Sequence, residues 1–266
     1  WIQNSLHPDE VQYGISLPSQ QAMESFFIGR LAMRTALHSL SSTNAFLLPS
    51  HQKTKKHDTN YNACCCNDGN SVNSPLDDKL DHSPSLPLPH VSHTEPSILK
   101  DEHGRPQIPH EFLGSISHKR NTGVALVSKN EQFQSNSSPK VGIGVDIERT
   151  FLKRKRLATK VLTDKEVQDL GNLQGVTRDQ EVLLRFSLKE CVYKAMHPLI
   201  CQFVGFKEAE ITPHDNGTAT VHLKLKNGAH EKFSEIIAHW RMLGDDEYFL
   251  TSSRVVLKDE YITDCT

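Results

Sequence analysis

Val141-Gly142-Ile143-Gly144-Val145-Asp146-Ile147-Glu148 is an apolar run that ends in two acids, and we predict a β-strand from Val141 to Ile147. Because alternate side chains of a strand share a face, Asp146 and Glu148 project together while Val145 and Ile147 point into the core. Two carboxylates held this close repel each other unless a cation lies between them, and oxygen ligands suit a hard ion such as Mg²⁺. An exposed strand end with two solvated acids is the alternative, and this short motif does not decide between them.

Downstream, helical spacing predicts a long helix from Asp179 to Met196 that Pro198 closes. It contains Phe186-Ser187-Leu188-Lys189-Glu190-Cys191-Val192-Tyr193-Lys194. Glu190 and Lys194 are four residues apart and share a face, as in an ordinary helix ion pair. In a functional interpretation Glu190 is a third metal ligand or a base, and Lys194 holds a phosphate or a leaving-group oxygen. The two interpretations are compatible.

A third segment, Gly114-Ser115-Ile116-Ser117-His118, lies upstream of both. Ser115 and Ser117 fall on one face of a short strand, and the strand ends at a histidine that can donate to a phosphate. A single histidine is usually structural, and the chain has 15 of them. His118 therefore gains its interest only from the neighbouring motifs.

The order of elements predicts an α+β fold built of two similar halves, residues 1–139 and 140–266. Each half combines a helix with short strands, although the sequence contains no strong internal repeat. The expected elements are a helix over 22–40, strands over 112–117 and 122–127, the strand over 141–147, a helix capped by Thr163 and Glu166 that runs toward Leu170, the long helix, and strands over 218–225, 236–240 and 248–256.

The segment from Ser50 to Ser97 differs from the rest, because it is rich in Pro, Ser, Asn, Asp and His and lacks periodicity. We interpret it as a disordered insertion in the first half, which a folded domain tolerates because long surface loops cost little closure entropy.

The three segments quoted above, together with two upstream segments quoted below, resemble the phosphopantetheinyl transferases of the surfactin and enterobactin synthetase type. That family's hallmark is a G-(I/V)-D-x-E strand followed by a (W/F)-(S/C)-x-K-E-x-x-x-K helix, and both occur here. Gly29-Arg30-Leu31-Ala32-Met33-Arg34-Thr35-Ala36-Leu37 is similar to the G-R-x-A-x-R-x-A-L helix of the enterobactin branch, and Gly104-Arg105-Pro106 with residues 114–118 to its G-x-P and G-S-I-S-H pair. The resemblance covers most of the chain outside residues 50–97.

The resemblance implies two similar α+β halves, packed face to face, with coenzyme A in the cleft between them. It implies that Asp146, Glu148 and Glu190 ligate a Mg²⁺ ion at the pyrophosphate. The residues implied at the cofactor's phosphates or nucleotide are Arg30, Arg105, Ser117, His118, Lys189 and Lys194, with Arg34 as a further helper. Family members usually bring more basic residues from their N-terminal region, whereas no Lys or Arg precedes Arg30 here.

The implied reaction moves 4'-phosphopantetheine from coenzyme A to a serine of an apo acyl or peptidyl carrier protein and releases 3',5'-ADP. Glu190 would act as the base, while Lys194 and the metal would offset developing charge. A non-catalytic coenzyme A-binding protein that retains the fold is the principal alternative. A metal-dependent phosphohydrolase is a more distant one, and the sequence offers it no second cluster of metal ligands.

Charge and composition limit the partners. Lys and Arg number 30 against 32 Asp and Glu, so no general attraction to nucleic acid or to an anionic membrane is expected, and no apolar run is long enough to span a bilayer. Six cysteines without C-x-x-C spacing support neither disulfides nor zinc. The family resemblance implies a monomer, and we expect it in the cytoplasm, mitochondrion or plastid, not as a secreted protein. The basic run Lys153-Arg154-Lys155-Arg156 is either a docking site for an acidic carrier helix, a solvated helix start or a mimic of a nuclear-localisation signal.

Overall fold

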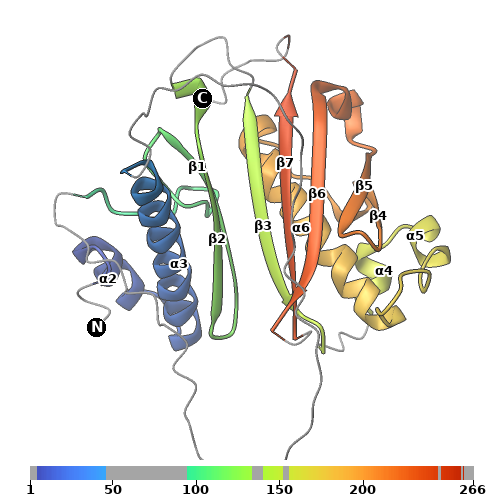
Figure 1. The fold of residues 1–266 in the computed structure, drawn as a ribbon, viewed down its shortest axis with the longest axis horizontal. Coiled ribbons are helices and arrows are strands. Elements are labelled where there is room, and N and C mark those ends of the chain that lie inside the picture. Colours follow the sequence, from blue (N-terminus) through green and yellow to red (C-terminus); the bar gives the residue numbers. More distant parts are fainter. Residues whose placement is uncertain are drawn as a thin grey trace, which may run out of the picture.

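The structure is a computed structural model, which describes residues 5–45, 95–133, 140–151, 156–244, 247–258 and 260. It has an α+β fold in which two antiparallel sheets lie side by side, each with a long helix (Figure 1). The α+β class predicted from the sequence is thereby confirmed.

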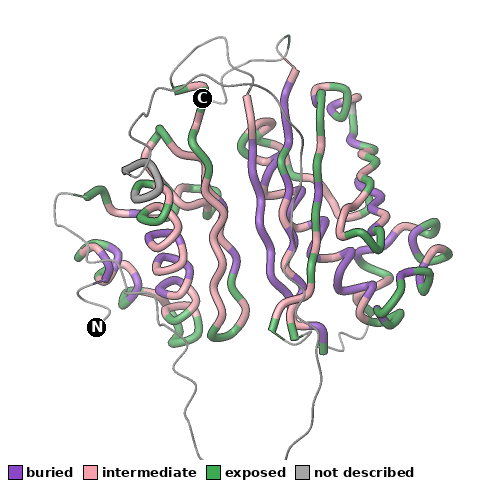
Figure 2. Tube along the Cα trace, in the orientation of Figure 1, coloured by how far each residue is buried: buried purple, intermediate pink, exposed green. Residues whose placement is uncertain are grey.

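The larger sheet has five strands in the order β3-β7-β6-β5-β4. Its strands are β3 (Val141–Arg149), β4 (Ala209–Pro213), β5 (Thr218–Leu223), β6 (Phe233–Leu243) and β7 (Tyr248–Leu257). Helix α6 (Arg178–Ile200) packs on this sheet, and the buried residues gather where α6 meets β3 and β7 (Figure 2). Leu184, Leu188 and Val192 of the helix form the core there with Phe249 and Val255 of β7.

The smaller sheet is a hairpin of β1 (Phe112–Lys119) and β2 (Thr122–Lys129), against which α3 (Gln20–Ala45) packs. Helix α2 (Pro8–Ile15) precedes α3, and Leu6, Phe26 and Phe27 form a separate apolar cluster in this region. Two short helices, α4 (Leu157–Val161) and α5 (Asp164–Gln168), follow β3 in the sequence and precede α6. Three short 3-10 helices span Glu131–Phe133, Phe206–Glu208 and Lys226–Lys232.

Two glycines of β3 allow α6 to lie directly on the strand. A Cβ atom at Gly142 would come within 1.9 Å of the Ala195 carbonyl oxygen, and one at Gly144 within 1.9 Å of the Cys191 carbonyl oxygen. Real side chains cannot approach main-chain atoms so closely, so only glycine permits this contact. The close approach brings the middle of α6 next to Asp146.

The two sheets meet where β1 lies against β3, and serine hydroxyls make the connection. Ser115 Oγ accepts a hydrogen bond from the Val145 N–H at 3.1 Å, and Ser117 Oγ accepts one from the Ile147 N–H at 3.3 Å. β3 lies between the hairpin on one side and β7 on the other (Figure 1). Side chains of β1 therefore satisfy main-chain donors of β3 that the sheet itself does not use.

Most of the predicted elements are present at nearly the predicted bounds. The Thr163 capping box is confirmed, since Glu166 N–H donates to the Thr163 hydroxyl and the Thr163 N–H donates to the Glu166 carboxylate, although α5 already ends at Gln168. The prediction that Pro198 closes the long helix is wrong, because α6 continues to Ile200. A proline in the last turn removes one hydrogen bond only, and the Cys201 N–H still donates to the His197 carbonyl at 2.9 Å. The sequence analysis did not predict α2, α4 or β4.

The similarity of the two halves stays a prediction, since the described residues give the first half two strands and the second half five. Of the proposed insertion, residues 50–94 lie outside the described residues. Its predicted end at Ser97 is wrong, because residues 95–97 belong to the packed structure: Arg34 donates to the Glu95 carboxylate at 3.1 Å and to the Pro96 carbonyl at 3.2 Å.

Candidate active site

The Asp146 carboxylate is the best-connected polar group of the site. One oxygen, Oδ1, accepts hydrogen bonds from Ser117 Oγ at 2.7 Å and from Lys194 Nζ at 2.8 Å. The other, Oδ2, accepts one from Ser187 Oγ at 2.8 Å, and Lys194 also donates to the Val145 carbonyl at 3.0 Å. Asp146 is 5% exposed. Three elements, β1, β3 and α6, thus converge on one buried carboxylate.

Glu148 lies on the same face of β3 and is 6% exposed. Its Oε2 atom is 2.5 Å from Lys119 Nζ, at the end of β1. Each strand acid therefore has a lysine against it, Lys194 at Asp146 and Lys119 at Glu148. Burial of a charge is costly unless a counter-charge accompanies it, so the two lysines offset part of the cost of burying the two acids.

Glu190 does not join the two strand acids in this arrangement. Within the described part of the chain, no group of three His, Cys, Asp or Glu side chains is placed to hold a metal ion. Glu190 instead lines a pocket one turn of α6 away from Ser187. The convergence of all three acids on one ion stays a prediction.

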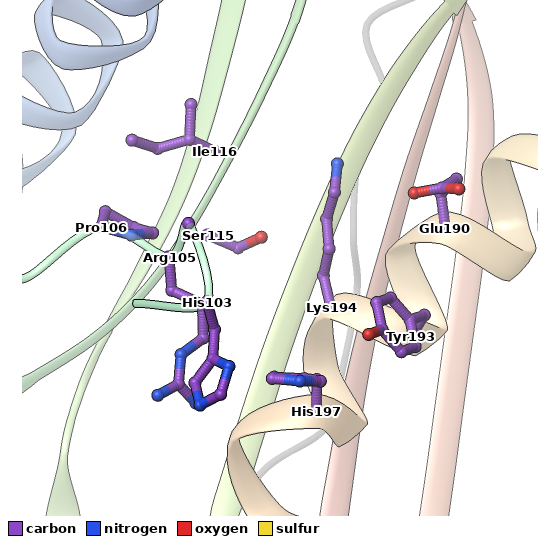
Figure 3. A pocket seen from close by; sticks show the side chains of 10 residues that line it. His103, Arg105, Pro106, Ser115, Ile116, Glu190, Tyr193, Lys194 and His197 are labelled. Atoms are coloured by element: carbon purple, nitrogen blue, oxygen red, sulfur yellow. The ribbon is translucent and has the colours of Figure 1, made fainter. Parts of the chain in front are cut away.

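The pocket lies between the loop before β1, β1 itself and α6, and has a volume of about 230 Å³. On one side are His103, Arg105, Pro106, Ser115 and Ile116, and on the other Glu190, Tyr193, Lys194 and His197 of α6 (Figure 3). The His103 and His197 rings are 5.1 Å apart between centroids, and the Tyr193 and His197 rings 5.4 Å. The pocket combines cations, a carboxylate and flat rings, which suits a ligand with phosphate groups and a planar base.

Arg105 lines this pocket, and its expected role at the nucleotide stays a prediction. Its Nε donates to Asp101 Oδ2 at 2.6 Å, and its N–H donates to Asp101 Oδ1 at 2.8 Å. Gly104, with φ +79°, makes the turn between them, a conformation that favours glycine. Asp101 therefore orients the Arg105 side chain and the loop that carries it.

His118 is exposed and lies at the end of β1, close to several lysines. Its pKa is lowered from the usual 6.5, chiefly by desolvation and then by the positive charges of Lys194, Lys100 and Lys119, while Asp146 opposes the shift. A lowered pKa leaves the imidazole neutral at pH 7. The same lysine charges would attract an anionic ligand to this place.

Arg30 and Arg34 are not among the residues that line this pocket, and their expected role at a nucleotide stays a prediction. Arg30 is 4% exposed, donates to the Ile98 and Leu99 carbonyls, and lies over the Phe26 ring at 4.4 Å. Burial lowers the pKa of Arg30 to about 10. Arg34 is paired with buried Glu10 at 2.7 Å. Both arginines bind α3 to neighbouring segments, so the structure gives them a structural role.

Lys189 likewise has protein partners for its ammonium group, and its expected place in a phosphate cage stays a prediction. It is 3% exposed, and its three donor hydrogens are used by Glu166 Oε2 at 2.6 Å and by the Val161 and Phe206 carbonyls, each at 2.9 Å. Burial lowers the pKa of Lys189 and the Glu166 pair opposes that shift. Lys189 connects α6 to α5 and to the segment before β4.

Lys119, Ser187, Tyr193 and His197 were not singled out as site residues in the sequence, although patterns in it point to them. Strand alternation that joins Ser115 and Ser117 also places Lys119 on their face. Helical spacing from Glu190 places Tyr193, Lys194 and His197 three, four and seven residues on, along one stripe. The role of Ser187, by contrast, depends on contact between α6 and β3, which sequence periodicity does not reveal.

The acids of this site offer the kind of donor that Mg²⁺ prefers. Asp146 and Glu148 are buried oxygen donors on one face of a strand, and two ammonium groups already stand against them as cations. Hard oxygen donors that attract positive charge suit Mg²⁺. These two residues therefore fit a divalent ion.

Other expectations concern residues beyond the site. Lys153, Arg154 and Lys155 of the basic run lie outside the described residues, so its docking role is not tested. Cys191 and Cys201 are free thiols. Searching the described residues for a membrane-spanning helix finds none of sufficient length and apolarity.

Comparison with known proteins gives two matches to family models. The model of the 4'-phosphopantetheinyl transferase superfamily matches residues 142–251, and that of the 4'-phosphopantetheinyl transferase N-terminal domain matches residues 88–128. The first range contains β3 and α6, and the second contains the Gly104–Pro106 loop and most of the hairpin.

Individual relatives agree with these matches. The chain is 29% identical over 150 residues to 4'-phosphopantetheinyl transferase Npt of Nocardia iowensis, covering 54% of this chain and 64% of that protein. It is 25% identical over 149 residues to enterobactin synthase component D of Salmonella austin, covering 56% of this chain and 59% of that protein. The chain thus spans less than two thirds of the length of either relative.

A third relative is covered more completely. The chain is 33% identical over 82 residues to holo-acyl-carrier-protein synthase of Lactobacillus helveticus, covering 29% of this chain and 70% of that protein. Among solved structures, the holo-ACP-synthase of Plasmodium yoelii matches with a TM-score of 0.35 and 17% identity, over 46% of this chain and 100% of that one. Because that TM-score is low, the assignment depends on the sequence matches. On those matches, the chain belongs to the 4'-phosphopantetheinyl transferase superfamily.

Proposed function

We propose that the protein transfers the 4'-phosphopantetheine of coenzyme A to a serine of an apo carrier protein, with Mg²⁺, and releases 3',5'-ADP. Family membership supports the reaction class. The observation that carries the proposal is a contact between the strand motif and the helix motif of the family. Lys194 of α6 donates a hydrogen bond to Asp146 of β3, and Glu190 lines the same pocket as Lys194.

Asp146 and Glu148 would hold the Mg²⁺ ion, with Glu190 as the third ligand or as the base. When bound, the ion supplies positive charge that neutralises the pyrophosphate and its departing oxygen. Ser187 and Ser117 orient Asp146 toward that task, because each donates to a different carboxylate oxygen.

The pocket residues would bind and orient the coenzyme. Arg105 would reach the phosphates or the nucleotide from one side and Lys194 from the other, and His118 would donate a hydrogen bond to a phosphate oxygen. The rings of His103, Tyr193 and His197 offer a flat surface for the base.

The serine of the carrier protein is a weak nucleophile near neutral pH, so its proton must leave as it attacks the β-phosphorus. Glu190, on the pocket wall, would take that proton directly or through one water. Lys194 stabilises the negative charge that develops on the phosphoryl oxygens. Positioning and electrostatics would then supply most of the rate enhancement, as in other phosphoryl transfers.

A carrier protein is the proposed partner, and two similar α+β halves in one chain would complete the cleft without a second subunit, so we propose a monomer. The alternative is a coenzyme A-binding protein that keeps the fold and lacks turnover. Incubation of the purified protein with Mg²⁺, coenzyme A and an apo acyl carrier protein, followed by mass spectrometry of the carrier, distinguishes them. Addition of the phosphopantetheine mass supports the transferase. Coenzyme A binding without transfer to any of several carriers supports the alternative.

A further inference from the structure

Lys119 belongs to the site and is not assigned a role by the transferase motifs. It follows His118 at the end of β1, and its ammonium is 2.5 Å from Glu148 Oε2. Both side chains are largely enclosed, with 17% of Lys119 and 8% of Glu148 exposed. An ion pair this enclosed is weakly screened by water and salt, unlike a pair on the surface.

The buried centre is electrically balanced as it stands. Asp146 and Glu148 contribute two negative charges, and Lys194 and Lys119 contribute two positive charges at 2.8 Å and 2.5 Å. A divalent cation that binds alone leaves this centre with two uncompensated positive charges, which an enclosed site disfavours. A pyrophosphate diester carries two negative charges, so cation and ligand together restore the balance.

We propose that Lys119 is a resident counter-ion for Glu148 that must leave this carboxylate when a divalent cation binds, and that it thereby makes the cation and a phosphate-bearing ligand bind cooperatively. This inference rests on the proposed function, because it takes coenzyme A as that ligand. Lys119 positions and regulates the site and is not itself a catalytic residue. Its release from Glu148 leaves an ammonium group next to His118, where an anionic ligand can take it up.

The test measures binding, not turnover. Mn²⁺ serves as the probe ion, and its affinity for the protein alone is measured from the free-ion electron paramagnetic resonance signal. Coenzyme A affinity is measured by calorimetry with and without Mg²⁺. For the wild type we expect weak Mn²⁺ binding alone and a coenzyme A affinity that rises at least about tenfold with Mg²⁺, since coupling between two ligands is reciprocal.

Lys119→Met removes the counter-ion and leaves the centre with a net negative charge. We expect it to bind Mn²⁺ alone at least about tenfold more tightly than the wild type and to lose most of the Mg²⁺ dependence of coenzyme A binding. Lys119→Arg should retain the wild-type coupling. Lys129→Met is the matched control, because it removes one lysine from the exposed opposite end of the same hairpin.

Two results would overturn the inference alone: a Lys119→Met variant with wild-type Mn²⁺ affinity, or a folded wild type whose coenzyme A affinity does not respond to Mg²⁺. The second result needs no variant, so it applies even if Lys119→Met fails to fold. In both cases carrier modification by the wild type would leave the proposed function standing. A wild type that neither binds coenzyme A nor modifies a carrier would remove the proposed function and this inference with it.

Discussion

Ser187 Oγ of α6 donates a 2.8 Å hydrogen bond to Asp146 Oδ2 of β3. Ser187 is 0% exposed and its hydroxyl also lies 2.9 Å from Thr251 Oγ1, so it fixes the carboxylate from the sheet side of the helix. The serine of the family's helix motif therefore has a physical role, which is to hold the strand acid in a single orientation.

Ser187→Ala should lower the free energy of unfolding by about 1–3 kcal/mol, because it leaves a buried carboxylate oxygen without a donor. Urea denaturation measures this loss. Ser253→Ala is the control: it removes a buried hydroxyl that donates to the neutral Cys191 carbonyl at 2.9 Å, and should cost less. Equal losses in the two variants would contradict a special role for the Asp146 contact.

Lys189→Met should reduce stability rather than coenzyme A binding. The substitution leaves the buried Glu166 carboxylate unpaired, which costs about 3–5 kcal/mol. The double variant Lys189→Met/Glu166→Gln should recover part of the loss, because it removes the unpaired charge. Thermal unfolding and calorimetry with coenzyme A measure the two properties. A stable single variant with weakened coenzyme A binding would instead show that Lys189 binds the phosphates of the coenzyme.

Gly144→Ala should prevent α6 from lying on β3, since the added Cβ would meet the Cys191 carbonyl oxygen. We expect a destabilisation of about 3 kcal/mol or more, at the upper end of the cost of overpacking. Gly205→Ala is a suitable control, because the nearest atom to its Cβ is the end of the Glu208 side chain at 3.9 Å. Similar stability of both variants, measured by thermal unfolding, would disagree with the close contact.

His118 should couple coenzyme A binding to proton uptake. Its pKa is lowered in the free protein, and a phosphate beside the ring would raise it. The affinity for coenzyme A should therefore increase as the pH falls through the raised His118 pKa of the complex. It should level off below the lowered His118 pKa of the free protein. Calorimetry in buffers of different ionisation enthalpy counts the protons. His118→Asn should lose this contribution, while protonation of coenzyme A itself is common to both proteins and cancels.

Glu190→Gln should reduce carrier modification by a factor of about 10² to 10⁴, the usual contribution of a general base, while coenzyme A still binds. The amide preserves the size of the side chain but cannot take a proton. Carrier mass spectrometry over time gives the rate, and calorimetry gives the affinity. Full turnover by this variant would exclude Glu190 as base or ligand.

Local patterns in the sequence were sufficient for much of the fold. Short strand-like runs identified β1, β2, β3, β6 and β7, and alternation identified β5. Helical periodicity identified α3 and α6, and a capping box identified α5, because these features depend on neighbours along the chain. Short elements such as β4 are stabilised by tertiary contacts, here including a hydrogen bond from the Ile211 N–H to Glu166, and carry no comparable signal.

Motifs located the site better than they assigned roles within it. Arg105 and Lys194 line the pocket, and their roles at the cofactor stay predictions. Arg30 and Lys189 were expected there from the family resemblance. Neither lines the pocket, and each donates a hydrogen bond to a carbonyl of a segment distant in sequence, which local patterns do not reveal. Strand alternation places Lys119 on the face of Ser115 and Ser117, but only the fold reveals that it contacts Glu148.

The serine contacts between β1 and β3 have a consequence for solubility. An outer strand with unused main-chain donors invites pairing with a strand of another molecule, which is a common start of aggregation. Here the Val145 and Ile147 amides are already occupied by the hydroxyls of Ser115 and Ser117. The hairpin also covers this edge of β3, so it offers no open template for a strand of another molecule. Ser117, which orients Asp146, thereby also helps to protect the protein against aggregation.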